Sequence, residues 1–277
     1  MKTLVTHFHP DLDSLTSCWL IKRFYPGWED AEIVFVDAGK TLNDNEPDTD
    51  PNILHIDTGL GQFDHHQTNE YTSATQRVYF FLLKNKYLSE DLNEQLERIV
   101  NHVNDVDHFA EVYYPNPTSD IYDFNLSQII EGLNATLKSA HKVMDHGFIT
   151  LDAILQLFKN KIAAEKAIKE GYVFESKWGK TLAMETKNEE SMKLALKTYY
   201  KVVIRKDPEK GNLRIKTLPQ KELDLTPLYQ ILKKQDPKAT WYLHLSKNML
   251  LNGSSKRPSS VPTSLSLKKV IEIIKEI

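Results

Sequence analysis

Short apolar runs alternate with helical patterns through the first half of the chain. Apolar positions spaced about 3.6 residues apart predict helices, and short apolar runs flanked by turn or charged residues predict buried strands. The predicted strands are residues 3–6, 32–36 and 53–56, and the predicted helices are residues 12–25, 72–86 and 90–104. The order strand, helix, strand favours an α/β fold in which a parallel sheet carries helices on both faces.

The pattern then becomes helical, at residues 125–138 and 148–170, and stops at Gly171. Beyond this glycine it restarts, with predicted strands at 181–185, 200–205, 212–217 and 240–244 and helices at 189–199, 226–235 and 265–276. A turn sequence between the second and third of these strands predicts a hairpin. We therefore expect two domains, residues 1–170 and a smaller mixed α/β domain of residues 171–277.

Composition narrows the class of protein. The chain has 277 residues, of which 40% are hydrophobic and 26% charged, as in ordinary globular proteins. No apolar run approaches the length of a membrane span, and the N-terminal residues lack the apolar segment of a secretory signal. A lone cysteine, Cys18, cannot form an internal disulfide. These features favour a cytoplasmic protein that does not bind membranes.

Charge divides unevenly along the chain. Residues 201–277 hold 16 Lys and Arg against 7 Asp and Glu, a balance of +9, whereas the first 200 residues have a balance of −12. An acidic part followed by a basic part suits an anionic substrate held between them, although two solvated surfaces explain the same counts equally well.

Acids and histidines gather at the ends of the predicted strands in the first half. His7, Asp11 and Asp13 follow the first strand, where a loop can turn all three side chains toward one point. Taken singly, Asp11 could form a turn and Ser14 could cap the next helix. The combination favours a site for Mn²⁺ or Mg²⁺, since carboxylates with a few imidazoles suit these cations.

Two further segments extend this pattern. Asp57 ends a buried strand, where an acid is costly unless it is paired or bound to a metal. Asp64-His65-His66 offers two imidazoles with an acid that can orient one of them. Asp105 and Asp107, at the end of a helical pattern, could supply one more ligand or form an ordinary solvated helix end.

Together, these motifs resemble those of the DHH phosphoesterase superfamily, and are most similar to its Myg-type exonuclease-like branch. The resemblance is good over residues 1–110. It implies two metal ions, Mn²⁺ with Mg²⁺ as an alternative. It implies that His7 and Asp11 hold one ion, that Asp13, His65 and Asp107 (or Asp105) hold the other, and that Asp57 bridges them. Asp64 would then orient the histidines, and His66 would face the substrate phosphate.

A weaker signal lies in the second domain. Small and cationic residues there could cradle a phosphate, and they look like the substrate-binding segment of the superfamily: Asn252, Gly253, Ser254, Ser255, Lys256 and Arg257. A basic loop without function explains this segment almost as well. His9, within the first loop, is a further candidate substrate contact.

We therefore expect a metal-dependent phosphohydrolase that cleaves a phosphodiester in a nucleotide or a short single-stranded oligonucleotide by two-metal activation of water. Asp57, Asp64 and His66 would be the catalytic residues. One alternative is an inorganic pyrophosphatase or short-chain polyphosphatase, and another is a non-catalytic sensor that binds metal or nucleotide. A homodimer is left open, as are the substrate and the direction of any exonuclease activity.

Overall fold

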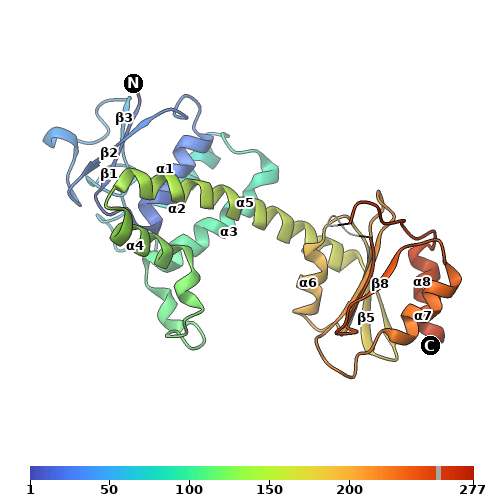
Figure 1. The fold of residues 1–277 in the computed structure, drawn as a ribbon. Coiled ribbons are helices and arrows are strands. Elements are labelled where there is room, and N and C mark those ends of the chain that lie inside the picture. Colours follow the sequence, from blue (N-terminus) through green and yellow to red (C-terminus); the bar gives the residue numbers. More distant parts are fainter. Residues whose placement is uncertain (254–256) are drawn as a thin grey trace. The chain divides into compact units, whose positions relative to one another are not determined.

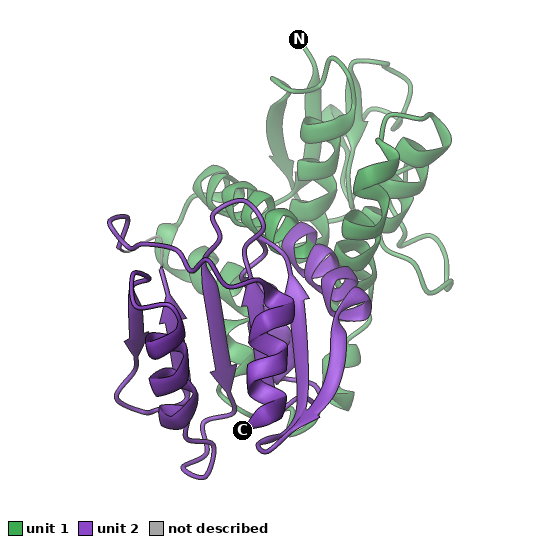
Figure 2. Ribbon diagram, turned by 90° about the vertical axis from the view of Figure 1, so that its right-hand side faces the viewer, with its two compact units in different colours: residues 1–158 green, residues 159–277 purple. Residues whose placement is uncertain are grey.

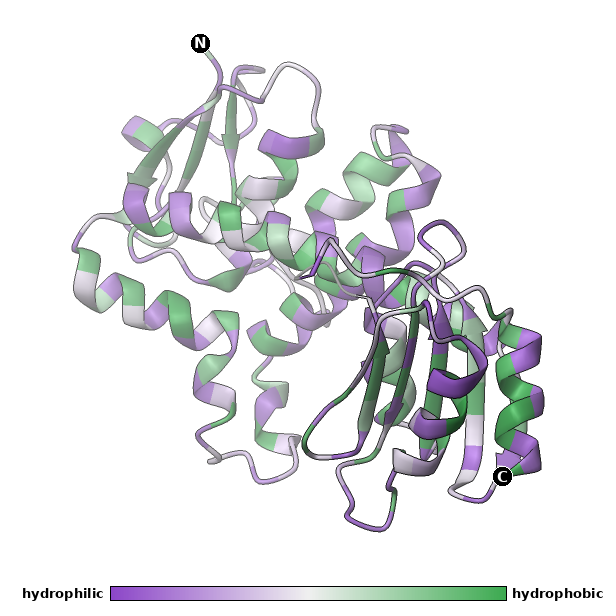
Figure 3. Ribbon diagram, turned by 45° about the vertical axis from the view of Figure 1, so that its right-hand side comes forward, coloured by the Kyte–Doolittle hydropathy of each residue, from purple (hydrophilic) through white to green (hydrophobic). Residues whose placement is uncertain are grey.

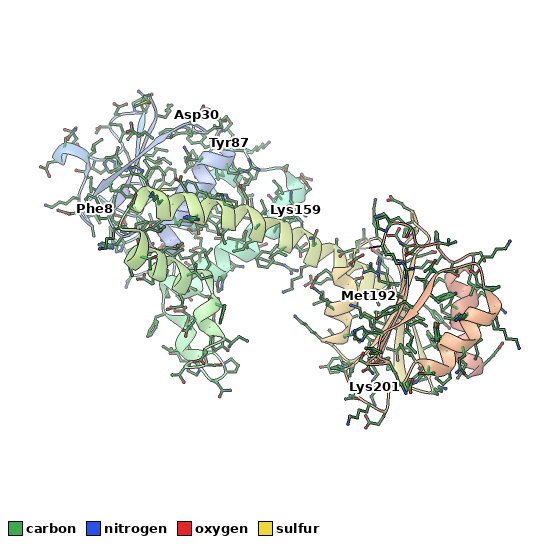
Figure 4. The ribbon with its side chains drawn as sticks, in the orientation of Figure 1. Phe8, Asp30, Tyr87, Lys159, Met192 and Lys201 are labelled. Carbon is green, nitrogen blue, oxygen red and sulfur yellow. The ribbon has the colours of Figure 1, made fainter. Side chains whose placement is uncertain are left out.

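The computed structural model of the protein describes residues 1–253 and 257–277. The chain forms two compact units, residues 1–158 and residues 159–277 (Figure 2). The boundary between them falls within the long helix α5 (Ala140–Glu170), near Lys159, which Figure 4 labels. The boundary expected from the sequence, after residue 170, coincides with the C-terminal end of this helix.

Unit 1 is built on a three-stranded parallel sheet of order β2-β1-β3. Its strands are β1 (Thr3–His7), β2 (Glu32–Val36) and β3 (Ile53–His55). The central strand, β1, is buried on both faces, because Leu4, Val5 and Thr6 are all fully inaccessible to solvent. Since the strands are parallel, their carboxyl ends meet at one edge of the sheet.

Helices supply the rest of unit 1. They are α1 (Leu12–Phe24), α2 (Ala74–Lys84), α3 (Glu90–Asp107), α4 (Leu126–Leu137) and the first part of α5, with short 3₁₀ helices at Leu42–Asp44, Ala110–Tyr113 and Tyr122–Phe124. Helix α1 contacts both α2 and α3. Because every residue from Leu12 to Ile21 is buried, α1 forms the centre of the core rather than one side of it.

Unit 2 contains a six-stranded mixed sheet of order β4-β5-β6-β7-β9-β8. Its strands are β4 (Tyr172–Ser176), β5 (Gly179–Glu185), β6 (Val202–Lys206), β7 (Leu213–Thr217), β8 (Trp241–Leu243) and β9 (Met249–Asn252). Strands β5 and β6 are parallel, and the other neighbours are antiparallel. The predicted hairpin is confirmed as β6 and β7, whereas β4 and β9 are not among the predicted strands.

The helices of unit 2 lie on both faces of its sheet (Figure 1). They are α6 (Glu190–Leu196), α7 (Thr226–Gln235) and α8 (Leu267–Glu276). Alternate residues of β6 divide between two cores: Ile204 packs with the residues of α7 and α8, and Val203 packs with Met192 of α6. Figure 3 shows the matching alternation of hydrophobic and hydrophilic residues along α8, whose Val270 and Ile273 are buried. The predicted α/β class with a mixed second sheet is confirmed.

Within the described residues, no helix combines the length and the apolar character that crossing a membrane requires.

Candidate metal centre

The loop between β1 and α1 holds the first three candidate ligands. His7 is the last residue of β1, and Asp11 is the N-cap of α1. The Asp11 carboxylate accepts a hydrogen bond of 2.9 Å from the Ser14 backbone N–H, and the Ser14 hydroxyl accepts one of 3.0 Å from the Asp11 N–H. This reciprocal capping corrects the alternative reading of Ser14 as the cap, since Ser14 is the third residue of the helix.

Asp13 lies in the first turn of α1 and is held by a second helix. Its two carboxylate oxygens accept hydrogen bonds of 2.8 Å from the backbone N–H groups of Ala74 and Thr75, at the start of α2. The side chain is 2% exposed. Helix N-termini stabilise negative charge, so the start of α2 holds the Asp13 side chain in place and favours its ionised form against the effect of burial. Sequence reasoning missed this contact, because Ser73, which caps α2, indicates where the helix begins but not what its N-terminus faces.

Asp57 stands just beyond β3, between two histidines. Its Oδ2 lies 3.3 Å from His7 Nε2, and its Oδ1 lies 3.4 Å from His65 Nε2. The residue is 3% exposed, and its φ of 56° is in the left-handed region, which is uncommon outside glycine. Strained backbone of this kind is concentrated at functional sites, because the surrounding structure must stabilise it.

The Asp64-His65-His66 segment separates into one buried acid and two imidazoles. Asp64 is fully buried and accepts hydrogen bonds from His66 Nδ1 at 2.7 Å and from the backbone N–H of Leu60 at 2.7 Å. His65 points its Nε2 into the cluster, whereas the side chain of His66 is 59% exposed. Asp64 is thus placed to orient an exposed imidazole and is not one of the grouped ligands.

The C-terminal end of α3 distinguishes Asp107 from Asp105. Asp107 Oδ2 lies 3.6 Å from His65 Nε2, and its side chain is 17% exposed. Asp105 instead accepts a hydrogen bond of 2.9 Å from the hydroxyl of Tyr71. The Tyr71 ring stacks near His108, with centroids 4.0 Å apart, and His108 is another neighbour of Asp107 that sequence reasoning did not single out.

Three overlapping groups of potential ligands result among the described residues. Within each group the donor atoms lie within 4.8 Å of one another: His7, Asp11 and Asp57; Asp13, His65 and Asp107; and Asp57, His65 and His66. Asp57 and His65 link the groups. Apart from His66, which the resemblance placed facing the substrate phosphate, these are the residues that the resemblance assigned to two neighbouring ions.

Burial and neighbouring charges shift the pKa values of the acids and histidines of the cluster. Burial, together with the charge of Asp57, raises the pKa of Asp11, of Asp13 and of Asp107. For Asp57, burial alone would raise the pKa. The hydrogen bonds and charges of His65 and His7 have a larger, opposite effect, so the pKa of Asp57 is lowered. The Asp57 carboxylate in turn helps to raise the pKa of both histidines to about 9, for His7 against the opposing effect of burial.

The donor set fits divalent cations. Asp57 Oδ1 and His65 Nε2 are buried and have no hydrogen-bond partner in the part of the chain that the structure describes, an arrangement that costs free energy unless another group binds these atoms. Four carboxylates and two inward-facing imidazoles supply hard oxygen and nitrogen ligands. Buried His and Asp side chains of this cluster can therefore hold metal ions, and the ligand types do not distinguish Mn²⁺ from Mg²⁺ or from other divalent ions.

The predicted substrate contacts are placed differently. His9 is exposed and belongs to none of the three groups. In unit 2, Asn252 is buried and bonds to the backbone of Thr240, Val261 and Thr263, so it joins loops together. Gly253 adopts a φ of 83° against the Asn212 side chain, and a side chain at this position would collide with it.

Three other residues of that segment, Ser254, Ser255 and Lys256, lie outside the described residues. The last residue of the segment, Arg257, is described. Arg257 lines a large cavity of unit 2.

Comparison with known proteins identifies the family. The family model described as "ChrB, C-terminal domain" matches residues 4–158, more than half of the chain. The chain belongs to this family. The range matched by the ChrB C-terminal domain model contains every residue of the metal-ligand cluster, from His7 to Asp107. No curated protein matches the sequence.

Two solved structures show distant similarity to this ChrB-family chain. One is described as the DHH domain of a member of the S1p family of ribosomal proteins, with 10% identity and a TM-score of 0.33, covering 99% of this chain and 86% of that one. The other is an exopolyphosphatase-related protein from Bacteroides fragilis, with 12% identity and a TM-score of 0.28, covering 99% and 91%. At these scores the similarities carry no argument about the site.

Proposed function

We propose that the protein is a divalent-metal-dependent phosphoesterase that hydrolyses a phosphodiester in a nucleotide or a short oligonucleotide. The observation that carries this proposal is a pair of ligand groups, His7 with Asp11 and Asp57 and Asp13 with His65 and Asp107, connected by a third group that contains both Asp57 and His65. When bound, two ions in such a site lower the pKa of water and stabilise charge on phosphate oxygens. The sequence resemblance to DHH phosphoesterases supports the same chemistry.

The protein's own contribution is to hold the groups in place. In hydrolysis the water oxygen forms a bond to phosphorus, the P–O ester bond breaks, and the leaving oxygen gains a proton. His66 is suited to contact the phosphate or to move that proton, because its ring is exposed while Asp64 fixes its Nδ1. Phosphoryl transfer requires positioning and charge stabilisation more than a covalent nucleophile.

A small cavity beside the cluster favours a phosphodiester over pyrophosphate as the substrate. Its volume is about 250 Å³, and Glu111 and Glu131 line it next to Asp11, Asp13 and Asp107. These two glutamates are not in the ligand groups, so their charges would remain after metal binding. They would repel pyrophosphate more strongly than a phosphodiester, which carries one negative charge per linkage.

The test is a hydrolysis screen with Mn²⁺ over pyrophosphate, mononucleotide esters, cyclic dinucleotides and oligonucleotides of 2–10 nucleotides. Asp57→Asn should abolish hydrolysis and keep the fold, because asparagine also tolerates the left-handed backbone of this position. Asp30→Asn, at an exposed residue labelled in Figure 4, is the matched control and should retain activity.

Each outcome of the screen is informative. Full turnover by Asp57→Asn would refute the mechanism, and exclusive cleavage of pyrophosphate would favour the pyrophosphatase alternative. Tight binding of Mn²⁺ without turnover of any substrate would favour a non-catalytic sensor.

A further inference from the structure

Two arginines of unit 2 lie directly opposite each other in the β6–β7 hairpin. Arg205 and Arg214 are paired in register, so their side chains leave the same face of the sheet. Their side chains are only 2% and 12% exposed. Like charges in opposing strand positions are destabilising, and burial increases the cost. An arrangement this costly needs a compensating negative charge.

Glu189 provides that charge in part. Its Oε2 lies 2.6 Å from Arg214 Nη1, and its Oε1 lies 3.6 Å from Arg205 Nη2. One carboxylate therefore faces both guanidinium groups. The Glu189 side chain is 55% exposed, which leaves it free to move into solvent at low cost. Asp207, 3.6 Å from Arg205 Nη1, is more firmly fixed, because its other oxygen accepts two backbone hydrogen bonds.

Both arginines retain unused donors. The Nε atoms of Arg205 and Arg214 are buried and have no hydrogen-bond partner within residues 1–253 and 257–277. Burial, with the neighbouring Arg214 charge, also lowers the pKa of Arg205. A guanidinium group presents its donors as a planar fork that matches two oxygens of a phosphate. The pair is therefore incompletely satisfied by the protein itself.

The pair borders the cavity of about 1220 Å³ that Arg257 also lines. Charged residues dominate its walls: the cations Lys187, Arg205, Lys210, Arg214 and Arg257 and the acids Glu189, Glu190, Asp207 and Glu209. The Lys187–Glu209 pair is exposed and self-neutralising, with the charged atoms 2.6 Å apart. Glu189 and Asp207 balance the arginine pair in the ligand-free protein, so release of Glu189 would leave a net positive charge there, and the cavity has room for the remainder of a phosphorylated molecule.

We propose that Arg205 and Arg214 form a binding site for the phosphate group of a phosphorylated small molecule, and that the Glu189 carboxylate occupies the place of this phosphate in the ligand-free protein. A phosphate dianion carries more charge and more acceptor oxygens than a carboxylate, so it would displace Glu189 from Arg205 Nη2 and Arg214 Nη1. The site lies wholly in unit 2, goes beyond the proposed hydrolysis and does not depend on the metal centre.

Titration calorimetry of the full chain with inorganic phosphate and with AMP, at low ionic strength and in EDTA, tests this site without the metal centre. Arg214→Gln should weaken binding about 10-fold or more, because charge-assisted hydrogen bonds are lost. Glu189→Gln should instead strengthen binding severalfold, because a competing carboxylate is removed. Glu190→Gln, which changes a neighbouring acid of the same cavity, should leave the affinity unchanged.

The opposite signs expected for two neighbouring substitutions separate a binding role from a structural one. Loss of folding would weaken binding in both variants, and circular dichroism would detect it. Unchanged affinity of Arg214→Gln, or weaker binding by folded Glu189→Gln, would overturn the proposal. Because EDTA removes divalent ions, failure here would leave the proposed hydrolysis intact, and failure of the hydrolysis screen would leave this site intact.

Discussion

The buried carboxylate of Asp64 accepts a hydrogen bond of 2.7 Å from Nδ1 of His66, whose ring is 59% exposed. The same Asp64 oxygen accepts the His66 backbone N–H at 3.1 Å. The acid therefore fixes both the main chain and the ring of the one histidine of the cluster that faces solvent. A carboxylate that accepts a hydrogen bond from a ring nitrogen sets the orientation and the tautomer of the imidazole.

We predict that Asp64→Asn reduces hydrolysis of a phosphodiester about 10- to 100-fold and leaves the number of bound Mn²⁺ ions unchanged. The amide group no longer fixes the tautomer of His66, while the ligand groups around Asp57 stay intact. Steady-state kinetics with bis(p-nitrophenyl) phosphate and metal analysis of the same samples measure the two quantities.

A double-mutant cycle provides the control. If Asp64 acts through His66, then Asp64→Asn combined with His66→Gln should be no slower than His66→Gln alone. Multiplicative losses in the double variant would show that the two residues act independently.

Asp107 and Asp105 form a matched pair for testing the last ligand. Asp107 belongs to the group with Asp13 and His65, whereas Asp105 bonds to the hydroxyl of Tyr71. We predict that Asp107→Asn lowers Mn²⁺ affinity by at least about 10-fold. Loss of a residue that supports a metal ligand typically lowers metal affinity by about 10-fold or more, and loss of the ligand itself should cost at least as much. Asp105→Asn should bind Mn²⁺ as the unaltered protein does. Titration calorimetry with Mn²⁺ measures the affinity of both variants. A larger loss in Asp105→Asn than in Asp107→Asn would assign the ligand to Asp105.

Asp236 stabilises unit 2 in a pH-dependent way. Its Oδ2 accepts hydrogen bonds from the Thr263 hydroxyl at 2.7 Å and from the Ser264 N–H at 2.8 Å. Burial alone would raise the pKa of Asp236. The hydrogen bonds have a larger, opposite effect, so the pKa of Asp236 is lowered. Because the pKa is lower in the folded state, the ionised carboxylate stabilises the fold at pH values above the unfolded pKa of about 3.9. This stabilisation is lost as the pH falls from there through the folded pKa.

We therefore predict that Asp236→Asn lowers the free energy of unfolding of unit 2 by about 1–3 kcal/mol at pH 7. The difference from the unaltered protein should shrink as the pH falls below about 4. Hydrogen exchange of the peptide covering residues 261–270, measured between pH 3 and pH 7 with correction for the intrinsic rates, reports on this region. A difference that persists undiminished at pH 3 would contradict the role given to the carboxylate.

The candidate centre could be predicted from the sequence because its ligands follow strand ends closely. His7, Asp11 and Asp57 each stand at or just beyond the end of a short apolar run, and parallel strands bring such ends to one edge. The choice between Asp105 and Asp107 could not be made in this way. The two acids are separated by two positions on one helix, and only the packing of α3 determines which of them faces His65.

The rest depends on contacts between distant segments. Nothing in the local pattern indicates that α2 donates two N–H groups to Asp13, or that Arg205 and Arg214 share one face of a sheet with Glu189. The edge strand β4 was missed for a related reason: only Phe174 of its five residues is buried, so a buried-strand pattern is absent. Helix α5 begins at Ala140, before the predicted start at residue 148, and it continues through Gly147 although glycine disfavours the interior of a helix.

Two helical glycines should respond to alanine with opposite signs. Gly147 in α5 lies against the side chain of Leu15 in α1, and a Cβ at this position would collide with that side chain. Leu15 is fully buried in the core of unit 1, so it has little room to move. We predict that Gly147→Ala destabilises unit 1 by about 1–3 kcal/mol through overpacking.

Gly132 in α4 has no described atom within 4 Å of such a Cβ, so Gly132→Ala should stabilise the helix by about 0.5–1 kcal/mol. Thermal unfolding of both variants in EDTA measures the two effects, and a gain in stability from Gly147→Ala would show that α5 does not pack closely on α1.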